Sequence, residues 1–119
     1  MTDKITTVED IKNKVRKFVE DREWQQFHSP KSLSMCIACE AAELMELFTW
    51  VDDKASKLEL EKKREAVEHE AADVMFAILN FCLRNNIDVT TALETKIALL
   101  DKKYPIEKSK GNNAKYTEL

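Results

Sequence analysis

The sequence predicts an all-α protein, and three observations carry that prediction. The chain of 119 residues contains one glycine and two prolines, so few positions favour turns. Apolar residues recur three and four positions apart along most of the chain, which is the period of an α-helix. No segment alternates apolar and polar residues as a half-buried strand does. We therefore expect one domain over residues 1–119, built as a four-helix bundle from two helical hairpins.

Each predicted helix has a recognisable start or end. The helices cover, in order, about residues 8–26, 30–50, 57–83 and 89–103, with connections at 51–56 and 84–88 and tails at about 1–6 and 106–119. Thr7 with Asp10 gives the first helix a start signal. Ser29 before Pro30 gives the second helix an N-cap followed by a proline at the first helical position.

Charge, hydropathy and cysteine content narrow the functional classes. The net charge of −3 gives no support for binding nucleic acid or an anionic membrane. No apolar run approaches the roughly 20 residues that span a bilayer, and no signal peptide is evident, so we expect a cytoplasmic protein. Cys36 and Cys39 form a C-x-x-C inside an apolar helical run without a second ligand pair. Buried thiols are therefore a better interpretation than a zinc or redox site.

Two copies of an acid-Ala-Ala-acid frame lie on the second and third predicted helices. We call their acids the four-acid cluster: Glu40, Glu43, Glu70 and Asp73. The first pair fills gaps in an apolar stripe, and the second pair lies with Asn80 on another such stripe. A single E-x-x-E pair is usually solvated, but two pairs on the apolar stripes of neighbouring helices are not. We therefore expect the four acids to face inward, toward one another.

Four inward carboxylates need a neutralising partner. An isolated buried carboxylate costs several kcal/mol, and neighbouring negative charges raise the pKa of each acid. The two stripes contain no lysine or arginine. Mg²⁺, for which Mn²⁺ can substitute, prefers carboxylate oxygens, and the alanines between the acids let two helices approach an ion closely. The pattern thus predicts a divalent-cation site.

Three interpretations of such a site differ in their chemistry. A di-iron site needs Glu-x-x-His pairs, whereas His69 directly precedes Glu70 and points off the stripe. A non-catalytic helical interaction protein would use the cation for stability alone. Phosphate chemistry would use Mg²⁺ to clamp a polyphosphate and activate water, and the absence of a P-loop motif leaves metal and basic side chains to hold the phosphates.

The spacing of the two frames supports the third interpretation through a family resemblance. Glu-Ala-Ala-Glu at 40–43 and Glu-Ala-Ala-Asp at 70–73, with 26 residues between them, resemble the E-x-x-E…E-x-x-D signature of the all-α nucleoside triphosphate pyrophosphohydrolases, the MazG-like superfamily. The stretches EDREWQQFHSPKSL, CEAAELMELFTW, KKYP and the final KYTEL are similar to the dCTP pyrophosphatase branch over nearly the whole chain.

The resemblance implies a MazG-like bundle assembled as a homodimer or a dimer of dimers, without direct nucleic-acid binding. It implies that water converts a dNTP to dNMP and pyrophosphate, with Mg²⁺ on the four-acid cluster and with Glu40 or Glu43 orienting or deprotonating the water. Such an enzyme removes unwanted deoxynucleotides from the cell. The substrate-binding residues it implies are Trp24, Phe27, His28, Lys31, Trp50, Asn80, Lys103, Tyr104, Lys115 and Tyr116. It favours dCTP, but Ala77 and Val15 replace a tyrosine and a histidine common in dCTP-specific relatives, so dATP or modified dNTPs are alternatives.

Overall fold

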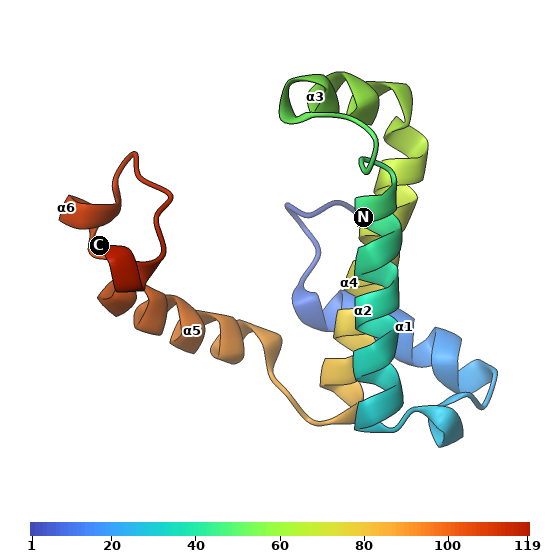
Figure 1. The fold of residues 1–119 in the computed structure, drawn as a ribbon. Coiled ribbons are helices and arrows are strands. Elements are labelled where there is room, and N and C mark those ends of the chain that lie inside the picture. Colours follow the sequence, from blue (N-terminus) through green and yellow to red (C-terminus); the bar gives the residue numbers. More distant parts are fainter. The chain divides into compact units, whose positions relative to one another are not determined.

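A computed structural model describes residues 1–119 and contains helices but no strands, which confirms the all-α fold class. The elements are α1 (Val8–Asp21), η1 (Gln25–Phe27), α2 (Pro30–Glu46), α3 (Asp53–Lys62), α4 (Arg64–Arg84), α5 (Val89–Lys103), α6 (Ile106–Ser109) and η2 (Tyr116–Glu118) (Figure 1). They form two compact units, Met1–Ile87 and Asp88–Leu119. The expectation of a single domain over residues 1–119 stays a prediction.

The first unit is organised around the pairing of α2 with α4, and α1 also packs against α4 (Figure 1). The long pair is antiparallel, because His28 before α2 meets Asn80 near the end of α4, while Leu47 after α2 accepts a hydrogen bond from Lys63 before α4. The buried apolar residues come from all three helices: Val15, Val19, Leu33, Ala77, Leu79 and Cys82. The core is therefore small and lies toward one end of the α2–α4 pair.

The predicted starts of the first two helices are confirmed by their capping bonds. The Thr7 hydroxyl accepts from the Asp10 backbone N–H at 3.0 Å, and the Asp10 carboxylate accepts from the Thr7 N–H at 2.9 Å, which makes a capping box. The Ser29 hydroxyl accepts from the Ser32 N–H at 3.1 Å, with Pro30 as the first helical residue. These local bonds fix where α1 and α2 begin.

The predicted helix ends are less accurate. The first helix ends at Asp21 instead of residue 26, because Glu23 takes a left-handed conformation with φ of 54° and only η1 follows. The second helix ends at Glu46 instead of residue 50 and continues as a turn. The predicted connection at 51–56 contains the start of α3, because the Asp52 carboxylate accepts from the Ala55 N–H at 2.8 Å and caps that helix.

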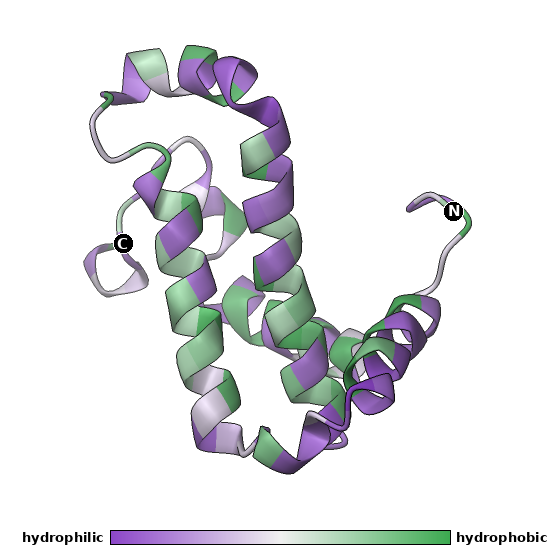
Figure 2. Ribbon diagram, turned by 90° about the vertical axis from the view of Figure 1, so that its right-hand side faces the viewer, coloured by the Kyte–Doolittle hydropathy of each residue, from purple (hydrophilic) through white to green (hydrophobic).

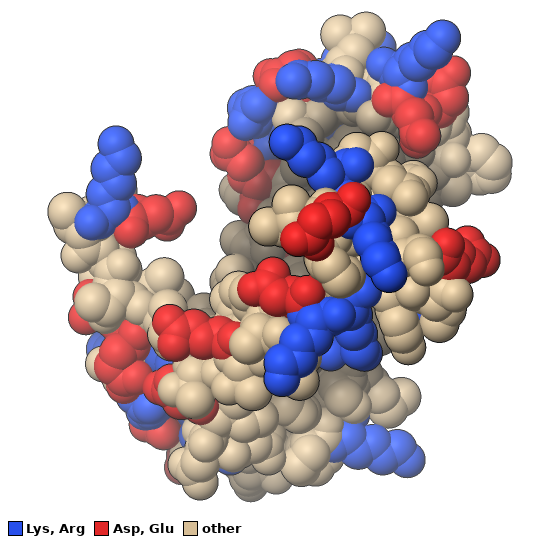
Figure 3. Space-filling view, turned by 90° about the vertical axis from the view of Figure 1, so that its left-hand side faces the viewer, with Lys and Arg blue, Asp and Glu red and all other residues tan.

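The predicted helix 57–83 is two helices, which helps to explain why the structure has six α-helices instead of four. Lys63 leaves the helical conformation, with φ of −113° and ψ of 26°, and divides α3 from α4. Lys63 at this junction pairs with Glu59 at 3.0 Å. Figure 3 shows Lys, Arg, Asp and Glu side chains gathered over the upper end of the molecule, where α3 lies. Figure 2 shows that hydrophilic and apolar residues are interspersed along the helices.

The second unit confirms the helix predicted at 89–103 and adds structure to the predicted tail. The Asp88 carboxylate accepts from the Thr91 N–H at 2.9 Å and caps α5. Beyond α5 the chain forms α6 and η2, so residues 106–119 are not a plain tail. The ring of Tyr116 packs edge-on against Tyr104, with 5.9 Å between centroids. The last residues therefore return to the end of α5.

The prediction of buried thiols is wrong for Cys36 and Cys39, whereas the third cysteine, Cys82, is buried. Cys36 and Cys39 are exposed, because they flank the stripe of α2 that packs against α4. No helix is long and apolar enough to cross a membrane.

Candidate metal centre

The four-acid cluster forms one site between α2 and α4. Glu40, Glu43, Glu70 and Asp73 each offer one carboxylate oxygen, and these oxygens all lie within 4.8 Å of one another. The spacing of three places each pair one turn apart on its own helix, and the antiparallel packing of α2 on α4 brings the two pairs together. The prediction that the acids face one another is confirmed.

The depth of the four side chains differs within the site. Glu40 and Glu70 are half-buried, because they continue the stripes through which α2 and α4 pack. Glu43 and Asp73 are exposed at the edge of those stripes. The expectation that all four are turned inward is therefore wrong for Glu43 and Asp73, since a spacing of three rotates the second acid by about 60° around the helix.

Two buried carboxylate oxygens have no partner within the chain. Glu40 Oε2 and Glu70 Oε2 are inaccessible to solvent and accept no hydrogen bond. No lysine, arginine or histidine forms an ion pair with any of the four acids. A buried polar group without a partner costs free energy, and the cost is greater when the group is charged. The chain itself therefore supplies no positive charge to neutralise these oxygens.

The local electrostatics point to the same conclusion. Burial raises the pKa of Glu40 above its ordinary value of 4.5, and the charges of Glu43 and Asp73 raise it further. Burial likewise raises the pKa of Glu70, again with Glu43 and Asp73 as neighbouring charges. Both carboxyls thus resist ionisation in the metal-free protein. A hard divalent cation fits this donor set, because the unpartnered oxygens could coordinate it and its charge would offset the repulsion between the four carboxylates.

The raised pKa values predict how the stability of the metal-free protein depends on pH. A carboxyl whose pKa is raised on folding binds more protons in the native state, so its contribution is favourable below pH 4.5 and is lost as the pH rises through the folded pKa. We expect the melting temperature of wild type to fall relative to Glu70→Gln as the pH rises. Thermal melts of both proteins in EDTA measure this difference, and a constant gap would contradict it.

The aromatic residues predicted to bind substrate are exposed to different degrees. Trp24 packs edge-on against Phe18 with 5.8 Å between ring centroids, and Phe27 lies exposed in η1. Trp50 is 94% exposed in the turn after α2, so this chain alone packs almost nothing against its ring. A tryptophan exposed to this degree is available to a ligand or to another subunit.

The structure brings Asn80 and His28 together near the base of α4. Asn80 Nδ2 lies 3.1 Å from His28 Nδ1, and Arg84 Nε donates to Asn80 Oδ1 at 3.4 Å. The sequence analysis did not single out Arg84. The sequence could have indicated Arg84, because it follows Asn80 by four residues and both side chains therefore lie on one face of the helix.

The remaining predicted residues are basic or tyrosine side chains. Lys31 is exposed in the first turn of α2. Lys103, Tyr104, Lys115 and Tyr116 all belong to the second unit, where Lys103 Nζ lies 4.8 Å from the centre of the Tyr116 ring. The three-residue group of Lys103, Tyr104 and Tyr116 is therefore a local cluster of one cation and two aromatic rings.

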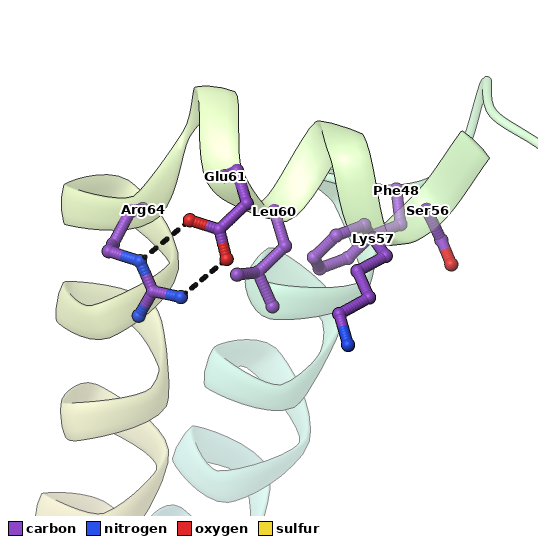
Figure 4. Close-up of a pocket in the computed structure, with 6 residues that line it drawn as sticks. All are labelled: Phe48, Ser56, Lys57, Leu60, Glu61 and Arg64. Atoms are coloured by element: carbon purple, nitrogen blue, oxygen red, sulfur yellow. Dashed lines mark hydrogen bonds and ion pairs between the residues drawn. The ribbon is translucent and has the colours of Figure 1, made fainter.

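A separate pocket lies at the other end of α2, where α3 turns into α4 (Figure 4). It is lined by Phe48, Ser56, Lys57, Leu60, Glu61 and Arg64. Arg64 and Glu61 form a two-point ion pair at its edge, at 2.7 Å and 3.2 Å. None of the four acids lines this pocket, so it is distinct from the candidate metal centre.

Known proteins are similar to this chain in sequence and fold. The model of the MazG-like family matches residues 35–119, a span that contains the whole four-acid cluster. The chain is 33% identical over 115 residues to dCTP pyrophosphatase 1 of Rattus norvegicus, a match that covers 95% of this chain and 68% of the relative. The Homo sapiens protein of the same name is 31% identical over the same shares of both chains. A solved pyrophosphatase from Archaeoglobus fulgidus is 34% identical with a TM-score of 0.79, covering 82% of this chain and 91% of that chain.

The family model covers more than half of the sequence, and the relatives match most of its length at more than 30% identity. The solved pyrophosphatase has a similar fold. This chain therefore belongs to the MazG-like family.

Proposed function

We propose that this chain is a Mg²⁺-dependent pyrophosphohydrolase that converts a dNTP, with dCTP favoured, to dNMP and pyrophosphate. The MazG-like family and the pyrophosphatase relatives make the chain a nucleotide pyrophosphatase, a hydrolase. The cation and the base are the proposed parts. The four-acid cluster, with its two buried and unpartnered oxygens, is the observation that carries the cation. The name of the curated relatives supports cytosine as the preferred base.

The four acids have distinct parts in the proposed reaction. Glu40, Glu43, Glu70 and Asp73 would hold Mg²⁺, for which Mn²⁺ can substitute. When bound there, the cation would offset charge on the phosphate oxygens and lower the pKa of water. Glu40 or Glu43 orients the attacking water and takes its proton. The water oxygen bonds to the α-phosphorus, the bond from that phosphorus to the bridging oxygen breaks, and pyrophosphate leaves.

The substrate contacts in this proposal are the residues that the family resemblance implies. The resemblance implies that Trp24 and Trp50 form aromatic walls for the base, with Phe27 and His28 nearby and Asn80 behind His28. Trp24 precedes α2 and Trp50 follows it, so the two walls of one site would come from two copies of the chain. Lys31, Lys103 and Lys115, with Tyr104 and Tyr116, meet the triphosphate. Lysine and arginine are the usual protein partners of phosphate oxygens when no P-loop is present. The activity would remove unwanted deoxynucleotides from the cytoplasmic pool before polymerases use them.

The base preference depends on positions that the structure places in the core. Val15 and Ala77 are both buried, on α1 and α4. Their small side chains leave less bulk at these positions than the histidine and tyrosine of dCTP-specific relatives. We therefore propose that dATP and modified dNTPs are accepted alongside dCTP.

A second copy of the chain completes the proposed site. Leu93, Ile97 and Leu100 form an exposed apolar stripe on α5, and Trp50 is uncovered in the single chain. Exposed stripes of this kind are usually buried by association. We expect a homodimer or a dimer of dimers, and sedimentation velocity checks this. A monomer at all concentrations would contradict it.

Product analysis tests the proposed reaction. In water enriched in ¹⁸O, we expect equal amounts of dNMP and pyrophosphate from each dNTP, with the label in the monophosphate because water attacks the α-phosphorus. Mass spectrometry of both products measures this. Release of dNDP and orthophosphate, or label in the pyrophosphate, would exclude attack at that phosphorus.

A further inference from the structure

Four polar side chains form a continuous hydrogen-bonded chain at the base of the first unit. We call it the Arg84 network: Glu20, Arg84, Asn80 and His28. Arg84 Nη1 donates to Glu20 Oε1 at 3.3 Å, and Arg84 Nε donates to Asn80 Oδ1 at 3.4 Å. The last link joins Asn80 Nδ2 to His28 Nδ1 at 3.1 Å. The network connects α1, α4 and the segment before α2.

The direction of every bond in this network follows from Arg84. A guanidinium can only donate hydrogen bonds, so the Asn80 atom facing it must be the carbonyl oxygen. The amide NH₂ of Asn80 then faces the imidazole, and His28 Nδ1 must accept. A neutral imidazole whose Nδ1 accepts carries its proton on Nε2. The network thus specifies one of the two tautomers of His28.

Burial strengthens the hydrogen bonds that fix the tautomer of His28. Asn80 is only 3% exposed, and the side chain of Arg84 is 16% exposed, so water competes poorly for their bonds. Burial lowers the pKa of His28, and the positive charge of Arg84 lowers it further. Both causes keep the imidazole neutral near pH 7. Glu20, the acidic group in the network, binds Arg84 and not His28.

The network lies within reach of a nucleotide bound at the metal centre. Asn80 follows Asp73 by seven residues, which is about 10 Å along the axis of α4. His28 stands before the first turn of the antiparallel helix α2, at the same end of the pair. This separation is on the scale of a nucleoside, whose α-phosphate would sit at the four acids.

We infer that Arg84 is a positioning residue that fixes His28, through Asn80, as a neutral hydrogen-bond donor at Nε2 for an acceptor atom of the nucleobase. The role toward the base rests on the proposed function, whereas the tautomer follows from the network alone. The ligand chemistry is a base edge with a carbonyl or ring-nitrogen acceptor, as cytosine presents. Asn80 and Glu20 are positioning residues as well, since they act through their neighbours.

The tautomer is measured directly by ¹⁵N NMR of the histidine ring nitrogens in the full-length wild-type protein. The chain has two histidines, and His69→Gln assigns the signals of His28. We expect an unprotonated Nδ1 and a protonated Nε2 at pH 7. A proton on Nδ1, or an equal mixture of tautomers, overturns the inference. This spectrum requires no nucleotide and no catalysis, so it tests the inference even if the enzyme turned over no substrate.

Variants of Arg84 test its role toward the base. In Arg84→Met the amide of Asn80 is free to rotate, so we expect His28 to show mixed tautomers and a higher pKa. We also expect KM to rise roughly threefold to tenfold, which is the contribution of one hydrogen bond, while kcat stays unchanged. Arg84→Lys retains a donor and a charge and should restore part of the KM. An unaltered tautomer in Arg84→Met overturns the positioning role, and an unaltered KM with mixed tautomers overturns the contact with the base.

A second variant covers the case in which Arg84→Met does not fold. Glu20→Gln removes only the charge that anchors Arg84 Nη1, at a side chain that is exposed. We expect the same changes in tautomer and KM at smaller size, with the helix content of wild type by circular dichroism. A variant that folds as wild type and changes neither property counts against Glu20 as part of the network.

Discussion

Glu70→Gln is expected to abolish nucleotide turnover and to raise the melting temperature of the metal-free protein. Glutamine keeps the shape of the side chain but removes a charge that the cation needs and that the apo site cannot satisfy, since Glu70 Oε2 is buried without a partner. Loss of metal activation is worth several kcal/mol, so kcat/KM should fall by about 10³-fold or more. Pyrophosphate release and thermal melts in EDTA measure the two effects.

Variants of the two exposed acids distinguish the effect of the cluster on turnover from its effect on stability. Glu43→Gln and Asp73→Asn should also abolish turnover, but with a smaller gain in melting temperature, because neither has a buried unpartnered oxygen. Glu68→Gln is the matched control, since Glu68 lies on α4 beside the cluster in sequence and pairs with Arg64 at 3.5 Å. Full activity in both cluster variants would show that the four acids are not the metal centre.

Trp50→Ala is expected to raise KM for the nucleotide while leaving unchanged the melting temperature measured at a concentration at which the protein is a monomer. Stacking of a base on an aromatic ring is worth about 1–3 kcal/mol, which corresponds to roughly 5- to 150-fold in binding. The ring is 94% exposed, so its removal takes away little packing within the chain. Steady-state kinetics with dCTP and melts of the monomer measure the two properties.

The control for Trp50 is another exposed apolar side chain. Leu58→Ala on α3 removes a side chain that is also exposed, and we expect KM to stay at the wild-type value. If Trp50→Ala also left KM unchanged, Trp50 would not be a wall of the base pocket. Its exposure would then have to be explained by contact with a second copy of the chain alone.

The sequence predicted the meeting of the four acids because local rules were sufficient there. A spacing of three places two acids on adjacent turns, and short connections make neighbouring helices antiparallel, so the two frames had to meet. The helix at 89–103 was predicted with its correct bounds for a similar reason. Asp88 caps its start, and Pro105 prevents it from continuing.

Other features depended on tertiary structure or on rare backbone geometry. The break at Lys63 interrupts a run of good helix formers without proline or glycine, so no local signal marks it. Glu23 has a positive φ, which is uncommon in a non-glycine residue and ends the first helix early. The bond from Asn80 to His28 joins residues 52 positions apart, and only the packing of the folded chain creates it.

The most direct test of the account is pyrophosphate release across dCTP, dATP, dGTP, dTTP, dUTP and the ribonucleotides, with Mg²⁺ and with EDTA. The account predicts that release requires the cation and that dCTP ranks first, with dATP also accepted because Val15 and Ala77 are small. Mn²⁺ should restore activity after EDTA treatment. Release that persists in EDTA, or no release from any nucleotide with Mg²⁺ present, would contradict the claim that the four acids hold a catalytic cation.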